Sequence, residues 1–173
     1  MINIQDVINK ENNADFASVL FLLEDDMLQS ESSAYRLIFD LWYIINEPDF
    51  DDELTFTEIE LETKLKSVYN VTHPLYLNSP NYLFFVGYMM LLTDWFFTGD
   101  MNLARQYLKK AHCMAPDNLL FQWGMWCDQS YQTTQSSVEY QKLCMDLNEN
   151  FHLYFKENGL LERYFKSIVC NEW

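Results

Sequence analysis

The most distinctive chemistry in this sequence is a dense run of carboxylates from Glu47 to Glu62, which we call the acidic segment. It contains eight acidic residues and no Lys, Arg or His. Clustered carboxylates pair with Arg through two hydrogen bonds and steer a positively charged partner, and aromatic side chains among them supply desolvated anchors. The sequence therefore predicts a protein-binding surface, with the candidate residues Glu47, Asp49, Phe50, Asp51, Asp52, Glu53, Glu58, Glu60 and Glu62.

A run of like charges is also typical of a solvated loop and helix face that only keeps a protein in solution. A pair such as Asp51-Asp52 could act as general acid and base, but carboxylates in a solvated run keep ordinary pKa values. A smaller cluster, Glu24-Asp25-Asp26, is interpreted as the polar face of a helix. Binding and solubility therefore both stay open as interpretations of the acidic segment.

The histidines and cysteines have no spacing that predicts catalysis or a metal site. No Cys-x-x-Cys occurs, and no His has a Cys, Asp or His at metal-ligand distance in the sequence. The fold could still bring a Cys and a His together, but a half-buried His112 beside a reduced, core Cys113 is the simpler interpretation. Phosphate-binding and hydrolase motifs are absent too, so we expect no enzyme, no cofactor and no metal. The residues concerned are His73, His112, His152, Cys113, Cys127, Cys144 and Cys170.

The overall charge excludes several classes of partner. The 173 residues include 26 acidic and 11 basic side chains, which gives a formal net charge of −15. A nucleic-acid binder needs the opposite sign to neutralise phosphates, and an anionic membrane surface would repel this chain. No signal peptide is recognisable, and the most apolar stretch, 82–97, is shorter than a membrane span and contains Asp94. We therefore expect a cytoplasmic protein whose partner, if the charge is used for binding, is a basic protein.

The elements that must position these residues are predicted to be helices. Apolar residues make up 49% of the chain, whereas Gly and Pro number only four each, so long helices with few turns are favoured over a β fold. We predict one all-α domain over residues 1–173 with about seven or eight helices. Their expected ranges are 14–28, 34–45, 57–69, 80–98, 103–114, 119–130, 138–147 and 160–169, with loops over 47–53 and 70–79.

Two short stretches allow a second interpretation. The alternation in residues 54–57 could be a short strand, although a helix start at Thr57 is favoured. Residues 151–156 could be extended or helical. Gly87, inside the apolar helix expected over 80–98, predicts a close crossing with another helix, because glycine lets two backbones approach.

One stretch, residues 95–118, resembles the second half of a tetratricopeptide repeat. Its small and large residues alternate as in the second helix of that unit, a Gly-Asp turn precedes this helix, and a proline ends it. Leu92 departs from the pattern, which has a small residue there, and a second copy over 121–147 matches poorly. The resemblance implies antiparallel helix pairs stacked in a right-handed bundle. The matching residues are Trp95, Gly99, Asp100, Ala104, Leu108, Ala111, Pro116 and Asn118.

The tail, residues 151–169, carries an aromatic pair, a glycine, and then Glu162-Arg163-Tyr164-Phe165. It resembles the C-terminal ends of small immunity proteins from bacterial toxin–immunity systems, including contact-dependent growth inhibition. The resemblance implies a cytosolic antidote that binds a cognate toxin domain, often a basic nuclease, with carboxylates in place of nucleic-acid phosphates. It carries over no site residues, and Tyr154, Phe155, Tyr164 and Phe165 are expected to serve the fold.

A chaperone or adaptor built from tetratricopeptide repeats, such as a type III secretion chaperone, is the alternative. Such proteins are also small and acidic, but they should show about three clear repeats, and only one is clear here. A row of aromatic residues in and just after the helix predicted over 119–130 could form a second contact surface, but core packing is the favoured interpretation. The row consists of Phe121, Trp123, Trp126 and Tyr131.

Overall fold

A computed structural model describes residues 2–47, 56–127, 137–155 and 157–169, and in this part of the chain all regular secondary structure is helical. The all-α prediction is confirmed, but the ten α-helices exceed the expected seven or eight. They are α1 (Ile4–Asn12), α2 (Phe16–Asp26), α3 (Glu31–Asn46), α4 (Glu58–Tyr76), α5 (Pro80–Leu92), α6 (Met101–Met114), α7 (Leu119–Trp126), α9 (Val138–Glu149), α10 (Phe151–Tyr154) and α11 (Leu160–Val169), and a 3₁₀-helix η2 (Asp94–Phe96) follows α5.

The two additional helices are α1 and α10. Helix α1 begins at a capping residue, because the Asn3 side chain accepts a hydrogen bond from the Gln5 N–H, and it buries Val7 and Ile8. Ala14 takes a left-handed conformation with φ 57°, so α2 begins only after it, with Asp15 as its cap. The helix predicted over 14–28 therefore begins two residues later than expected, and it also ends two residues earlier.

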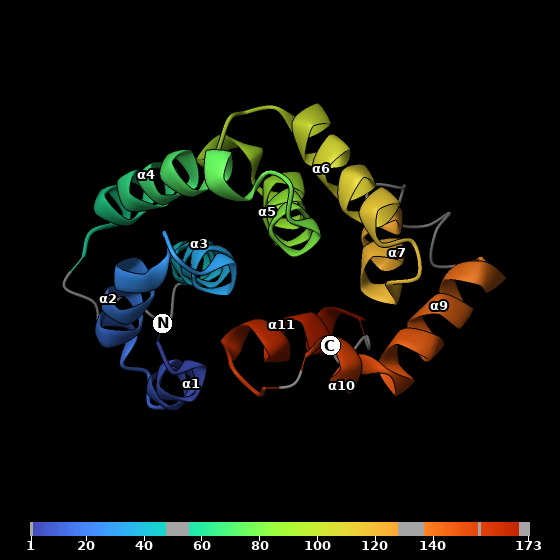
Figure 1. The fold of residues 1–173 in the computed structure, drawn as a ribbon, viewed down its shortest axis with the longest axis horizontal. Coiled ribbons are helices and arrows are strands. Elements are labelled where there is room, and N and C mark those ends of the chain that lie inside the picture. The colour runs from blue at the N-terminus through green and yellow to red at the C-terminus, as the bar shows by residue number, and fades with distance from the viewer. Residues whose placement is uncertain (1, 48–55, 128–136, 156, 170–173) are drawn as a thin grey trace.

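The helices follow one another around a closed arrangement (Figure 1). Helices α4, α5 and α6 form an arc, α3 packs against both α4 and α5, and α7 and α9 continue beyond α6. Helix α11 then returns to pack on α3 and on α1, so the two ends of the described chain meet. Most consecutive helices pack against each other, as expected for helix pairs, while the right-handed tetratricopeptide-like stacking stays a prediction.

The closest helix pair is α5 with α6, and Gly87 makes it possible. A Cβ atom at Gly87 would lie 2.9 Å from the Cβ of Tyr107 and 3.2 Å from the carbonyl oxygen of Ala104. Any larger residue would push the two backbones apart. The predicted close crossing is confirmed, and Ala104 and Leu108 are buried on α6 as the repeat-like pattern required.

Helix α4 is longer than predicted, because residues 70–76 are helical and not part of a loop. Pro74 stands in the last turn and removes only one backbone hydrogen bond there. Side chains hold this end in place: the Thr72 hydroxyl lies 2.8 Å from the Tyr82 hydroxyl, and the Tyr76 hydroxyl donates to the Met27 carbonyl at 2.9 Å. Tertiary contacts thus outweigh the local effect of the proline.

Helix α5 is shorter than predicted, since it ends at Leu92 and not near Thr98. Thr93 leaves the helical conformation, and its hydroxyl donates to the Met89 carbonyl while it accepts a 2.6 Å hydrogen bond from the indole N–H of Trp42. This buried contact fixes the turn into η2. Trp95 therefore lies in η2 and is exposed, not at the aromatic position of the first repeat helix.

Aromatic side chains form much of the core where α11 meets the other helices. Phe155 and Phe165 are buried with ring centroids 5.7 Å apart, and Tyr164 packs edge-on against Trp42. The expectation that the tail aromatics serve the fold is confirmed for these residues. In the aromatic row of α7, Phe121 and Trp123 are buried and Trp126 is half-buried, whereas Tyr131 lies outside the described residues. Of the helices described, none has the length and apolar character needed to cross a membrane.

Candidate functional site

The structure describes both ends of the acidic segment. Glu47 is the C-cap residue of α3, and the other end forms the first turns of α4. Four members of the predicted surface are therefore placed, namely Glu47, Glu58, Glu60 and Glu62. The remaining predicted members, Asp49, Phe50, Asp51, Asp52 and Glu53, lie outside the described residues.

Thr57 and Glu60 fix the beginning of α4 through a capping box. The Glu60 N–H donates to the Thr57 hydroxyl oxygen at 3.3 Å, and the Glu60 carboxylate accepts from the Thr57 N–H at 2.8 Å. The carboxylate also accepts from the Thr57 hydroxyl at 2.8 Å, and the hydrogen bonds that it accepts, first from the backbone N–H and then from the hydroxyl, lower the pKa of Glu60. The helix start predicted at Thr57 is confirmed, with Thr57 as the cap, and Glu60 keeps an exposed negative charge there.

Two lysines of α4 compensate part of this charge. The Lys66 Nζ lies 3.5 Å from a Glu62 oxygen, one helical turn away. The Lys64 Nζ lies 2.5 Å from the Glu24 carboxylate on α2. Glu58 forms no ion pair with any described residue. The α4 end of the acidic segment is thus negative, but lysines of the chain itself compensate part of its charge.

Large apolar side chains are exposed among these carboxylates. On α4, Ile59 is 76% exposed between Glu58 and Glu60, and Phe56 is exposed just before the helix. On the neighbouring helix α2, which the Lys64–Glu24 pair joins to α4, Phe21 is 71% exposed. Sequence analysis had not selected Ile59 or Phe21. Exposed apolar groups surrounded by charge are typical of binding surfaces.

The cluster Glu24-Asp25-Asp26 is not a uniform polar face, as had been expected. Asp26 is buried, and its carboxylate accepts a 2.8 Å hydrogen bond from the Ser33 hydroxyl. This contact joins the end of α2 to the start of α3. Only Glu24 and Asp25 remain at the surface beside α4.

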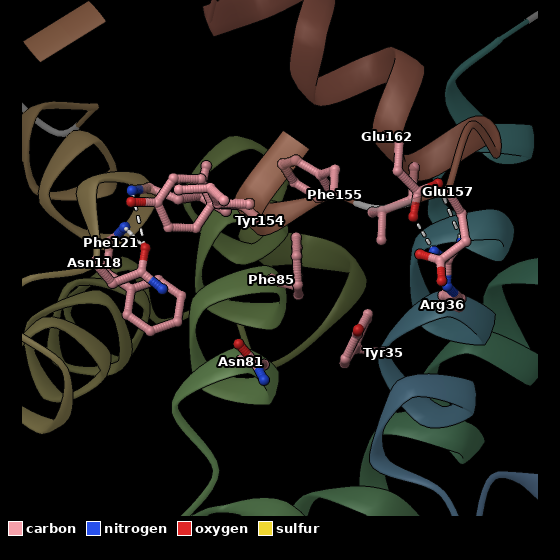
Figure 2. Close-up of a pocket in the computed structure, with 13 residues that line it drawn as sticks. Tyr35, Arg36, Asn81, Phe85, Asn118, Phe121, Tyr154, Phe155, Glu157 and Glu162 are labelled. Carbon is pink, nitrogen blue, oxygen red and sulfur yellow. Dashed lines mark hydrogen bonds and ion pairs between the residues drawn. The ribbon is translucent and has the colours of Figure 1, made fainter. Parts of the chain in front are cut away.

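A pocket of about 270 Å³ opens between α3, α5, α7 and the turn that joins α10 to α11 (Figure 2). Phe121 and Tyr154 lie on one side of it, and the charged side chains of Arg36, Glu157 and Glu162 lie on the other. The rings of Tyr35 and Phe85, whose centroids are 4.5 Å apart, lie between these two sides. No pattern in the sequence indicates this pocket, because its lining comes from five separate stretches of the chain.

One charged end of the pocket leads to a buried charge cluster, which we define as Glu11, Arg36, Asp40 and Glu162. The Arg36 guanidinium donates to both oxygens of Glu162, and it lies 4.0 Å from a Glu11 oxygen. Glu11 also accepts a 2.5 Å hydrogen bond from the Leu160 N–H, and Glu162 accepts a 3.0 Å bond from the Gly159 N–H. The cluster thereby joins α1, α3 and α11.

Gly159 is required for this arrangement, because a Cβ there would lie 2.6 Å from a Glu11 oxygen and 2.7 Å from a Glu162 oxygen. Asp40 completes the cluster, yet neither of its oxygens has a hydrogen-bond partner among the described residues. Burial raises the pKa of Asp40 well above its ordinary value, and the charge on Glu11 adds to the rise while Arg36 opposes it. Burial likewise raises the pKa of Glu11, against the hydrogen bond from Leu160 and the charge of Arg36.

No catalytic group comes together among the residues that the structure describes. His73 lies stacked between the rings of Tyr69 and Tyr107, and burial and the nearby Lys110 lower its pKa. His112 is half-buried as expected, but Cys113 is exposed, so its predicted core position is wrong. Cys113 comes six residues after Tyr107 on α6, so it lies on a different face of this helix from the ring that stacks on His73.

The other cysteines and acids give no metal centre either. Cys127 and Cys144 are half-buried, and Cys170 lies outside the described residues. Within the ranges given above, no group of three or more His, Cys, Asp or Glu side chains could hold a metal ion.

Comparisons with known proteins add no family to this description. No protein-family model, no curated protein and no solved structure matches the chain. The function therefore has to be argued from the surface and the charges of the chain itself.

Proposed function

We propose that this chain is an immunity protein that binds and neutralises a basic, nuclease-type bacterial toxin domain in the cytoplasm. The observation that carries the proposal is the exposure of Ile59, a large aliphatic residue that lies at the surface between Glu58 and Glu60 at the start of α4. An exposed apolar group ringed by carboxylates offers a desolvated anchor and a charged rim in one place. A basic groove that normally holds phosphates is the complementary surface.

The charge of the whole chain supports the same partner. At −15, the field of the protein attracts a cationic domain from a distance and disfavours nucleic acid itself. Four of the carboxylates in the acidic segment fall on residues 49–53, a few positions before Ile59 in the sequence. The capping box supports the proposal in a second way, because it holds the start of α4 in one conformation and so lowers the entropy lost on binding.

The proposal is tested by a growth assay with the toxin domain encoded beside this protein's gene. Cells that express the toxin should survive when they also express the wild-type chain. Reversing Asp51, Asp52, Glu53 and Glu58 to Lys should abolish this protection. The matched control reverses four acids outside the segment by the same change in net charge, and it should protect cells as the wild type does. The control residues are Asp6, Asp117, Glu139 and Glu149, all exposed.

Equal protection by the two reversed variants would contradict the role assigned to the acidic segment. Loss of protection by both would show that only total charge matters. The amounts of each variant in the soluble fraction are compared first, so that failure to fold is separated from failure to bind.

A further inference from the structure

The pocket in Figure 2 has a composition that fits one kind of occupant. Its volume of about 270 Å³ lies just below the roughly 300–1,000 Å³ typical of sites for small-molecule ligands and cofactors. A single long side chain is a better match in size. The aromatic side of the pocket would cover an apolar stem, and the charged side would meet the polar end of that chain.

The sign of the charge at the polar end follows from its contacts. Arg36 is the one cation among the described lining residues, and Glu162 engages it through both oxygens. This buried ion pair compensates the positive charge of Arg36 inside the protein. Glu157, in contrast, is exposed on the pocket wall and forms no ion pair with a described residue.

The ring of Tyr35 lies in the middle of the pocket, between its aromatic side and the carboxylate of Glu157 (Figure 2). Because the Arg36 guanidinium is engaged by Glu162, Glu157 is the charged group left to meet an occupant. A cationic occupant is therefore favoured there over an anionic one.

We propose that this pocket binds an arginine side chain presented by a protein partner. A guanidinium is planar, so it can stack on the face of Tyr35 or Tyr154 by a cation–π contact while its N–H groups donate to the Glu157 carboxylate. Lysine offers a compact charge without a planar face and fits less well. The proposal rests on the proposed function only in taking the arginine from a basic protein, because the pocket itself can be tested without one.

The test uses the whole chain and blocked arginine, N-acetyl-L-arginine N-methylamide, as the probe. Blocked citrulline has the same shape without the charge and is the control ligand. In ¹H–¹⁵N correlation spectra, blocked arginine should produce saturable shifts at the amides of Tyr35, Phe85 and Leu161. Citrulline should bind about threefold to fivefold more weakly, the size of one exposed charge-assisted contact.

The matched protein variants are Glu157→Gln and Glu149→Gln, both at exposed positions and with the same loss of charge. Glu157→Gln should weaken arginine binding by about the same factor as the change to citrulline, and Glu149→Gln should leave it unchanged. Equal binding of arginine and citrulline, no saturable shift, or full affinity in Glu157→Gln would overturn the proposal. None of these outcomes depends on the growth assay, so the pocket and the immunity function can fail separately.

Discussion

The Arg36 guanidinium on α3 and the Glu162 carboxylate on α11 form a buried ion pair with two hydrogen bonds. Arg36 is near the beginning of the described chain and Glu162 is near its end, so the pair closes the ring of helices in Figure 1. Glu11 on α1 approaches the same guanidinium. Three helices from both ends of the chain are therefore held by one positive charge.

Replacing Glu162 with Ala should destabilise the fold strongly. The substitution leaves the Arg36 charge buried beside the weaker Glu11 contact, and breaking a buried pair from one side costs about 3–5 kcal/mol. The free energy of unfolding is measured by urea denaturation followed by circular dichroism. The control, Glu24→Ala, removes the exposed pair with Lys64 and should cost less than about 1 kcal/mol. Similar losses in the two variants would contradict the bridging role of Glu162.

Replacing Asp40 with Asn should stabilise the protein more as the pH rises. Folded Asp40 has a pKa well above its ordinary value of 3.8, mainly because of burial, so its favourable contribution is complete below pH 3.8 and is lost as the pH rises towards the folded pKa. Asn does not ionise and lacks this loss. The gain of Asp40→Asn over wild type should grow by up to about 1.4 kcal/mol per pH unit between the two pKa values.

Urea denaturation of both proteins at a series of pH values between about 4 and 8 measures this gain. The lowered pKa of His73 acts with the opposite sign, since it favours the neutral form in the folded state, but it is present in both proteins and cancels in the difference. The exposed substitution Asp117→Asn is the control and should give a constant difference. A constant difference for Asp40→Asn as well would contradict the buried, partnerless state of this carboxyl.

Gly87→Ala should destabilise the chain, although alanine normally favours a helix over glycine by about 1 kcal/mol. The added methyl would lie 2.9 Å from the Cβ of Tyr107, and forcing such contacts costs about 1–3 kcal/mol. Packing therefore outweighs propensity at this position. Thermal unfolding measures the change, with Ser67→Ala on the exposed face of α4 as a control that should stabilise slightly. A higher melting temperature for Gly87→Ala would contradict the close α5–α6 contact.

Ile59→Ala should weaken binding of the toxin domain by about 1 kcal/mol or more, the usual loss for an anchor residue, without changing stability. Val138 is the matched control, because it is 77% exposed against 76% for Ile59 and also lies in the first turn of its helix. Isothermal titration calorimetry compares both variants with wild type. Equal affinities for Ile59→Ala and Val138→Ala would contradict the anchor role.

Much of the fold could be predicted because local signals and tertiary packing agree. The predicted starts of the helices over 80–98 and 57–69 agree with α5 and α4, and Gly87 predicted a close crossing. Errors arose where a distant contact outweighed a local signal. Pro74 suggested a loop, but the hydrogen bond from Tyr76 to Met27 keeps the chain helical there. Helix α1 was missed, although its cap Asn3 is a signal that could have found it.

The two candidate sites differ in how much of each could be predicted from the sequence. The acidic segment is contiguous, so its composition can be taken directly from the sequence. The ion pair of Lys66 with Glu62 also follows from their spacing of four residues on one helix, whereas the pair of Lys64 with Glu24 on another helix is seen only in the structure. The buried cluster joins Glu11 to Glu162, which are separated by most of the chain. Charged residues far apart in the sequence give no periodic pattern, and a single sequence does not show which of them share a core.

The most direct measurement of the central claim is the association rate constant with the basic toxin domain as a function of ionic strength. For wild type, the account predicts a fast rate at low salt that falls steeply as salt screens the acidic segment. The variant reversed at residues 51, 52, 53 and 58 should associate at least about tenfold more slowly at low salt, and its rate should fall less steeply than that of wild type as salt is added. A wild-type rate that does not depend on salt, or equal rates for the two proteins, would contradict the account.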